Sequence, residues 1–146
     1  MQARLIYNMA LSNTSQTVAD SDTDVEVFAT QHLTTLLNES LKYENSIRRR
    51  RKYDWEMDGK PPITPAEAAL MEELKESPII SNLDDDVPYA QTLCVNALVN
   101  GLTAFLWLDD ENPYNQQEFR NRYAFALNEA EQFIPDMVHT VYGIEE

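Results

Sequence analysis

Apolar side chains at helical spacing constrain the fold of this chain more than any other feature. Between residues 23 and 51 they recur at intervals of three and four, which places them on one face of a helix. Thr23 and Glu26 stand three residues apart at the start of this stretch, the spacing of a capping box. The pattern predicts one long amphipathic helix over residues 23–51, whose buried face comprises Val25, Phe28, His32, Leu33, Leu36, Leu37, Leu41 and Ile47.

Three further helices follow, and proline marks several of their ends. Thr64, Pro65 and Glu67 provide an N-cap, a proline at the first helical position and a second capping box. Residues 97–108 are apolar nearly all round, which is typical of a central helix surrounded by others. Pro135 is expected to kink or end the last helix. The predicted helices cover residues 64–77, 88–108 and 115–134.

These elements together predict an all-α fold, a compact bundle of about four helices. No stretch shows the strict alternation of a half-buried strand, and a length of 146 residues suits one domain. Residues 1–22 give the weakest pattern, because residues 4–7 could open either a short helix or a strand and Ser, Thr and Asp dominate from residue 12 onward. We expect residues 1–22 to form an irregular N-terminal arm or loop and residues 23–146 to form a single helical-bundle domain.

The composition excludes several classes of protein. Twenty-five acidic residues against eleven basic ones give a net charge of −14, which argues against a protein whose main role is to grip nucleic-acid phosphates. The single cysteine, Cys94, excludes an internal disulfide framework and a Cys-rich zinc site. The start of the chain does not resemble a signal peptide, and the apolar run over residues 93–108 is shorter than a membrane span. We expect a soluble protein that is made in the cytoplasm and has no membrane partner.

Catalytic and metal-binding motifs are nearly absent from the sequence. His32 and His139 have no ligand partner at helical spacing, and Cys94 is best explained as a small buried hydrophobic residue. Glu73 and Glu76 form one ExxE pair, but a magnesium cluster would need a second pair on another helix. We therefore expect no enzymatic activity, no cofactor, no metal and no small-molecule substrate.

A run of basic residues is the one local anomaly in charge. Residues 48–52 hold five of the eleven basic residues of the chain. One or two cations suit the negative end of a helix dipole, whereas five adjacent like charges imply a counter-surface. Two interpretations remain open: a solvated helix end, or a docking site for an acidic partner at which Tyr53 and Trp55 either anchor the partner or pack on the end of the bundle. The candidate partner-binding residues are Arg48, Arg49, Arg50, Arg51, Lys52, Tyr53 and Trp55.

The layout of the second half of the chain carries a resemblance. An acidic loop and a Pro–Tyr helix start occupy residues 82–89, an apolar helix follows, and an acid-rich turn at residues 108–111 precedes a helix that contains Tyr123. With the short apolar opening, the Ser/Thr/Asp loop and the long amphipathic helix of residues 5–41, this layout resembles the head-to-tail connector (adaptor) proteins of tailed phages. Residues 48–62 have no counterpart in that pattern, so the basic run is not a site that the resemblance supplies.

The resemblance implies a non-enzymatic virion protein that is made in the host cytoplasm. Its copies would form a ring, usually a dodecamer in that family, which docks on the portal, contacts tail proteins and lets DNA pass through an acidic channel without tight binding. The acidic surface leaves a second interpretation open, an acidic binding module that imitates DNA and inhibits a nucleic-acid-handling protein. The acidic residues are scattered rather than spaced like phosphates, and solubility accounts for most of them.

Overall fold

The predicted all-α class is confirmed, with one helix more than the four expected. The computed structural model describes the backbone over residues 1–14, 23–58 and 64–142, and the side chains over residues 1–14, 24–57 and 64–130. Within these ranges the chain forms helices and no strand. The helical rods are α1 (Ala3–Asn13), α2 (Thr23–Asp58), α3 (Pro65–Met71), a continuous central rod made of α4 (Gln91–Leu93), the π-helical turn η2 (Cys94–Leu98) and α5 (Val99–Asp109), and α6 (Pro113–Tyr142).

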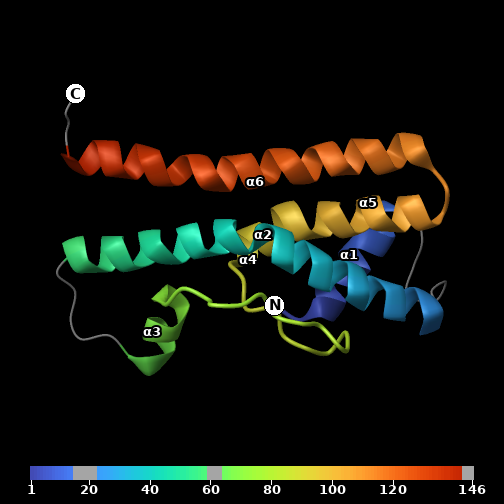
Figure 1. The fold of residues 1–146 in the computed structure, drawn as a ribbon, viewed down its shortest axis with the longest axis horizontal. Helices are drawn as coiled ribbons and strands as arrows, with labels where there is room; N and C mark the ends of the chain where they lie inside the picture. Colours follow the sequence, from blue (N-terminus) through green and yellow to red (C-terminus); the bar gives the residue numbers. More distant parts are fainter. Residues whose placement is uncertain (15–22, 59–63, 143–146) are drawn as a thin grey trace.

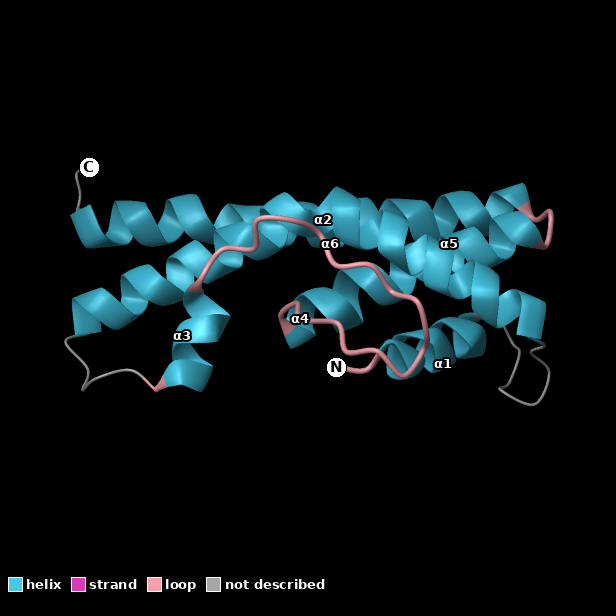
Figure 2. Cartoon of the chain, turned by 60° about the horizontal axis from the view of Figure 1, so that its bottom comes forward, coloured by secondary structure: helices cyan, strands magenta, loops and turns pink. Residues whose placement is uncertain are grey.

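The long helix α2 organises the other elements. Its 36 residues correspond to about 54 Å of helix. In Figure 1, α6 lies along one side of α2 and the central rod, whereas α1 and α3 lie on the other side. The segment that joins α3 to α4, residues 72–90, is called the strap below. Figure 2 shows that it runs from α3 across the bundle towards the N-terminus.

Helix α1 belongs to the core, which corrects the prediction of an irregular arm over residues 1–22. Its buried side chains recur at helical spacing and are among the least exposed in the protein. The first N–H groups of α1, which lack partners inside the helix, are satisfied by the strap: Ala3 donates to the carbonyl of Asp85 at 2.9 Å and Arg4 to that of Leu83 at 2.7 Å. The rest of the predicted arm, residues 15–22, lies outside the described residues.

The strap is held by polar side chains of α2 instead of by a helix or sheet of its own. The Asn45 side-chain amide donates to the carbonyl of Leu74 at 3.0 Å and accepts the N–H of the same residue at 2.8 Å. The Thr34 hydroxyl accepts the N–H of Ile80 at 3.0 Å. Because Thr34 precedes Asn45 whereas Leu74 precedes Ile80, this part of the strap runs antiparallel to α2.

Two predicted helix boundaries on this side of the bundle need correction. Helix α2 extends beyond residue 51, and α3 ends at Met71 although the sequence favoured an end near Ser77. The predicted capping box at the start of α3 is present, since the Thr64 hydroxyl accepts the N–H of Glu67 and the Glu67 carboxylate accepts that of Thr64. The early end follows from the polar contacts with α2, because they satisfy the strap backbone without further helical turns.

Helix α6 starts earlier and runs further than predicted. It begins at Pro113, because the side chain of Asn112 accepts the N–H of Asn115 at 3.1 Å and so caps the helix one turn before the expected start. It also continues through Pro135, where we expected a kink or an end. A proline already has a helical φ and costs one backbone hydrogen bond, and the turns on both sides of it remain helical here.

The central rod is the apolar helix that the sequence predicted. Gln91–Asp109 is long and apolar enough to span a membrane by composition, and 56% of its most apolar stretch is buried inside the protein. Such burial is typical of a helix that other helices surround. It approaches its neighbours tightly at Gly101, where an added Cβ would lie 2.7 Å from Cδ2 of Leu36 and 3.0 Å from Cδ1 of Tyr123.

Replacing Gly101 by valine should therefore destabilise the protein. A larger side chain at this contact must displace Leu36 and Tyr123, and such overpacking typically costs about 1–3 kcal/mol. We expect a lower free energy of unfolding in urea, measured by circular dichroism. Ala124→Val, at an exposed position of α6, is the matched control and should change the free energy by less than about 0.5 kcal/mol. Equal stabilities of the two variants would contradict the close approach.

Candidate functional site

The basic run does not form one exposed patch, because Arg48 points into the protein. Its side chain is almost completely buried, and its Nε lies 2.7 Å from Oε2 of Glu44, whose side chain is fully buried. One terminal nitrogen of Arg48 donates to the carbonyls of Ala69 and Glu72 at 2.9 Å each, and the other donates to the carbonyl of Pro88 at 2.5 Å. Arg48 is thus corrected from a candidate docking residue to a buried structural one.

The partner of Arg48 is equally well satisfied. While Oε2 of Glu44 faces Arg48, its Oε1 accepts the backbone N–H of Ala90 at 2.7 Å. The pair, which we call the clasp, therefore fixes the end of α3 and both ends of the strap to α2. Buried charges are tolerated when hydrogen bonds satisfy them on every side, as they do here.

The clasp could have been identified from the sequence, but Arg48 is the first residue of the basic run and was therefore interpreted as exposed. The buried stripe of α2 continues beyond Leu37 at the same spacing of three and four residues, through Ser40, Glu44 and Arg48. A stripe defined only by apolar residues leaves these polar positions out. An oppositely charged i, i+4 pair in line with the apolar face was the feature that could have identified them.

The other arginines of the run also have partners within the chain. Arg49 and Arg50 lie near carboxylates, whereas Arg51 faces the C-terminal end of α3, where free carbonyls carry partial negative charge. The counter-surface that five adjacent cations implied is thus supplied largely by this protein itself. The contacts are Arg49 Nη1 with Glu73 Oε1 at 3.0 Å, Arg50 Nε with Asp54 Oδ2 at 3.7 Å, and Arg51 Nη1 with the carbonyl of Leu70 at 3.1 Å.

The last three candidate residues lie at the junction of α2 and α3. Lys52 is exposed, and Tyr53 and Trp55 are half-buried. Lys52 and Trp55 line a hollow of about 360 Å³ together with Ala68 and Met71. Trp55 therefore lies beside α3, as expected of a side chain that packs on the end of the bundle. A role for these residues in binding a partner stays a prediction.

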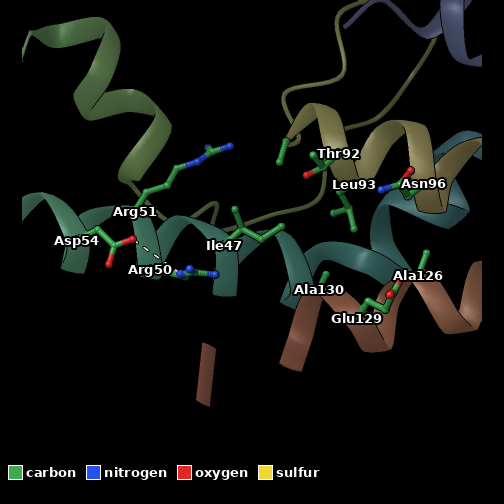
Figure 3. Close-up of a pocket in the computed structure, with 11 residues that line it drawn as sticks. Ile47, Arg50, Arg51, Asp54, Thr92, Leu93, Asn96, Ala126, Glu129 and Ala130 are labelled. Atoms are coloured by element: carbon green, nitrogen blue, oxygen red, sulfur yellow. Dashed lines mark ion pairs between the residues drawn. The ribbon is translucent and has the colours of Figure 1, made fainter. Parts of the chain in front are cut away.

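A groove opens beside the basic run, where α2, the start of the central rod and α6 meet. Figure 3 shows the side chains that these three elements contribute to it. Its volume is about 540 Å³. Among the residues whose side chains the structure describes, apolar ones form much of its lining, together with two arginines and two carboxylates. The lining residues are Ile47, Arg50, Arg51, Asp54, Ala90, Thr92, Leu93, Asn96, Ala126, Glu129 and Ala130.

The groove continues along α6 into a second hollow of about 590 Å³. Asn96, Ala126 and Glu129 line both hollows, which are together called the α6 groove below. In the second hollow Val95 and Phe125 are exposed, Phe125 to 65%. Val95 and Asn96 belong to the π-helical turn η2, which keeps Cys94, Ala97 and Leu98 buried and presents these two side chains at the surface.

A surface with several carboxylates and exposed apolar side chains lies at the start of α2. Val25 and Phe28 line a hollow of about 250 Å³ together with Asp109 and Asp110, so the start of α2 lies next to the end of α5. Phe28 and Leu108 are half exposed there. We call this region the acidic end, after the carboxylates of Asp109, Asp110 and Glu111 at the end of α5 and of Asp24 in the first turn of α2. Glu26, in the same first turn, lines a different hollow together with Arg4.

The turn between α5 and α6 gives the acidic end an unusual backbone. Glu111 has a φ of 57°, in the left-handed region that favours glycine. It ends α5 in a Schellman arrangement, because its N–H donates to the carbonyl of Leu108 and the N–H of Asn112 donates to that of Trp107. Three residues further on, Tyr114 is 82% exposed.

The other acidic cluster, at residues 84–86, is used within the fold. All three carboxylates contact the N-terminal residues or their own loop, so the cluster joins the strap to α1. The contacts are Asp84 with Arg4 Nε at 3.0 Å, Asp85 with the N–H groups of Ser81 and Asn82 at 3.0 and 3.1 Å, and Asp86 with the N-terminal amine at 3.1 Å.

The other residue types that could take part in catalysis or bind a metal, histidine and cysteine, make contacts that stabilise the fold. His32 stacks on the ring of Phe105, and its Nε2 lies 3.0 Å from Oδ2 of Asp109, so it joins α2 to the end of α5. Cys94 is fully buried, as predicted, and burial raises the pKa of its thiol to about 11. Over the described side chains, no group of three or more His, Cys, Asp and Glu residues is placed to hold a metal ion. The side chain of His139 lies outside the described residues.

Comparison with protein-family models, with curated proteins and with solved structures gives no match to this chain.

The clasp makes a strong prediction about stability. Arg48→Ala would remove the cation that neutralises the buried Glu44 carboxylate and the donor to Oε2 of Glu44 and to the carbonyls of Glu72 and Pro88, and breaking such a pair costs about 3–5 kcal/mol. We expect this loss in the free energy of unfolding, measured in urea. Arg49→Ala, which removes an exposed pair, is the control and should cost less than about 1 kcal/mol. Similar values for the two variants would refute the structural role of Arg48.

Two buried phenols and the thiol predict a loss of stability at alkaline pH. Burial raises the pKa of Tyr89, whose hydroxyl donates to the carbonyl of Leu37 at 2.6 Å, and that of Tyr123, whose hydroxyl donates to Glu39 at 3.0 Å. A raised pKa stabilises the fold below the unfolded value, near 10 for tyrosine, and this contribution is lost as the pH rises above it.

The free energy of unfolding should therefore fall steadily above about pH 10, as measured by urea titrations at a series of pH values. Tyr89→Phe should reduce this slope, because one group that must ionise on unfolding is gone. Tyr114→Phe, at a largely exposed phenol, is the matched control. A slope that both substitutions alter equally would show that the buried hydroxyl is not its source.

Proposed function

We propose that this chain is a non-enzymatic virion protein, a head-to-tail adaptor subunit whose copies form a ring on the portal. The observation that carries the proposal is a pair of unlike exposed surfaces on one chain, the α6 groove and the acidic end. A ring subunit meets its two neighbours through different surfaces, whereas a symmetric dimer uses the same surface twice. Exposed apolar side chains on both surfaces, Phe125 on one and Phe28 on the other, suit such contacts.

The positions of the residues that carry the resemblance support the same proposal. Pro88 and Tyr89 sit where the strap enters the central rod, held by the clasp and by the carbonyl of Leu37. Tyr123 packs beside Gly101 at the contact between α6 and the central rod. The residues that carry the resemblance therefore pack in the core of the bundle. A subunit fold shared with the adaptor proteins would require this, and surface residues could still differ between them.

The charge suits a protein that surrounds DNA without holding it. With a net charge of −14, the chain repels phosphates over the screening length of roughly 8 Å in physiological salt. A charge of this sign suits a subunit that lines a DNA channel.

The proposal predicts a stable complex with the portal protein of the same virion. Purified chain mixed with assembled portal should co-elute in size-exclusion chromatography and appear in electron micrographs as a second ring stacked on the first. Duplex DNA should not be retained by the chain in a gel-shift assay at physiological salt.

Two outcomes would contradict this proposal. Failure to co-elute with the portal at any salt concentration would exclude the adaptor role. Salt-sensitive binding to a polymerase or nuclease, in the absence of a portal complex, would favour the second interpretation, an acidic inhibitor of a nucleic-acid-handling protein, since contacts between surface charges weaken as salt rises.

A further inference from the structure

One continuous stretch of the chain has no buried side chain. None of residues 64–79, all of which the structure describes, is buried, whereas Ile80 directly after them is. The stretch comprises α3 with its N-cap residue and the first half of the strap, in which Leu74 is half-buried against the core and Ile79 is 76% exposed. Because burial of apolar surface is the main force that holds a segment in a fold, this stretch is held less firmly than the elements that form the core.

We propose that residues 64–79, called the flap below, open away from α2 as one unit while the core of the bundle stays folded. The flap is a conformational device built into the single chain. The inference goes beyond the proposed function and does not depend on it.

Polar side chains of α2 hold the flap, and one of them joins its two parts. Asn45 makes two hydrogen bonds with Leu74, and Nη1 of Arg48 donates to the carbonyl of Ala69 in α3 and to that of Glu72 in the strap. Because a helix of seven residues is not stable alone in water, α3 keeps its shape only while it is docked. The shared donor and the short helix therefore make the flap open as a unit.

The second half of the strap lies beyond the boundary of the flap. Ile80, Leu83 and Val87 are buried in the core. The N–H of Val87 donates to the carbonyl of Met1 at 2.8 Å, and the carbonyl of Leu83 accepts a hydrogen bond from the first turn of α1. We therefore place the hinge of the flap just before Ile80, whose N–H the Thr34 hydroxyl accepts.

The clasp divides along the same boundary. Only Nη1 of Arg48 donates to the flap, whereas its Nε pairs with Glu44 and its Nη2 donates to the carbonyl of Pro88. The other oxygen of Glu44 accepts the N–H of Ala90, which also lies beyond the hinge. The buried charges therefore stay paired when the flap opens, so opening avoids the large cost of leaving a buried charge without a partner.

Opening also changes the surroundings of the basic run. Arg49 pairs with Glu73, and Arg51 donates to the carbonyl of Leu70. Both partners belong to the flap, so they leave with it. The closed flap thus occupies two cations of the basic run, and the open flap releases them.

Hydrogen exchange at two matched amides tests the opening. The N–H of Leu74 donates to Oδ1 of Asn45 at 2.8 Å, and the N–H of Ala90 donates to Oε1 of Glu44 at 2.7 Å, so each binds a side chain of α2. With native-state exchange measured by NMR and corrected for intrinsic rates, we expect Leu74 to exchange at least about a hundredfold faster than Ala90. Exchange at Leu74 should also depend less on low concentrations of urea, because opening the flap exposes less surface than global unfolding.

A substitution in the core distinguishes opening of the flap from global unfolding. Ile6→Val, at a fully buried position of α1, lowers the stability of the whole fold and should speed exchange at Ala90 severalfold. It should leave the rate at Leu74 unchanged, because α1 stays packed when the flap is open.

A substitution at the flap contact tests whether α3 and the strap open together. Asn45→Ala removes both hydrogen bonds to Leu74 and should speed exchange at Ala68, whose N–H donates to the carbonyl of Thr64 in α3, by about tenfold. Asn121→Ala, at an exposed position of α6, is the matched control and should leave the rate at Ala68 unchanged.

Three results would overturn the inference. Equal protection of Leu74 and Ala90 would show that the flap opens only when the protein unfolds, as would a rate at Leu74 that Ile6→Val raises as much as the rate at Ala90. A rate at Ala68 that Asn45→Ala leaves unchanged would show that α3 and the strap do not open as one unit. Each of these results leaves binding to the portal, and so the adaptor role, to its own test.

Discussion

The buried pair of Glu44 and Arg48 is the contact on which one whole side of this protein depends. The strap has no helix or sheet to satisfy its backbone, so its carbonyls need donors from elsewhere. One guanidinium supplies them at Ala69, Glu72 and Pro88, and one carboxylate both neutralises that guanidinium and accepts the N–H of Ala90. Removing two charges from water is expensive, and the cost is offset here by the ion pair and by four further hydrogen bonds to backbone groups.

The clasp also sets the directions in which the neighbouring basic side chains point. Because Arg48 points inwards, the helical spacing of α2 sets Arg49 and Arg51 towards α3 and the strap, where Glu73 and the carbonyl of Leu70 engage them. The sequence suggests that the five basic residues form an external docking site. In the structure, most of them instead contact groups of this same chain. Arg50, which lies near Asp54, is at the edge of the run that borders the α6 groove.

The sequence predicted best those elements that local rules control. The period of α2, the capping box at Thr64 and the all-round apolar pattern of the central rod are local, and each formed a helix. Helix α1 was not predicted firmly, because its apolar stripe is short, fits a short helix or a strand at residues 4–7, and precedes a loop-like segment. The clasp was missed because the identity of Arg48 predicts exposure, while its burial depends on carbonyls more than twenty residues away. The strap could not be predicted, since its order comes only from non-local partners. The α6 groove was not foreseen either, because it forms where three elements distant in sequence meet.

The net negative charge opposes the proposed ring, because copies of an acidic chain repel one another where they must make contact. Every added copy brings fourteen further negative charges, yet solvent and salt reduce their repulsion beyond roughly 10 Å. Assembly then depends on contacts within that distance, where apolar burial and balanced charge can exceed the residual repulsion. The contact between α5 and α6, packed around Gly101, holds the α6 groove and the acidic end at a fixed distance within one subunit, so a ring of the proposed kind would take its geometry from the fold of the single chain.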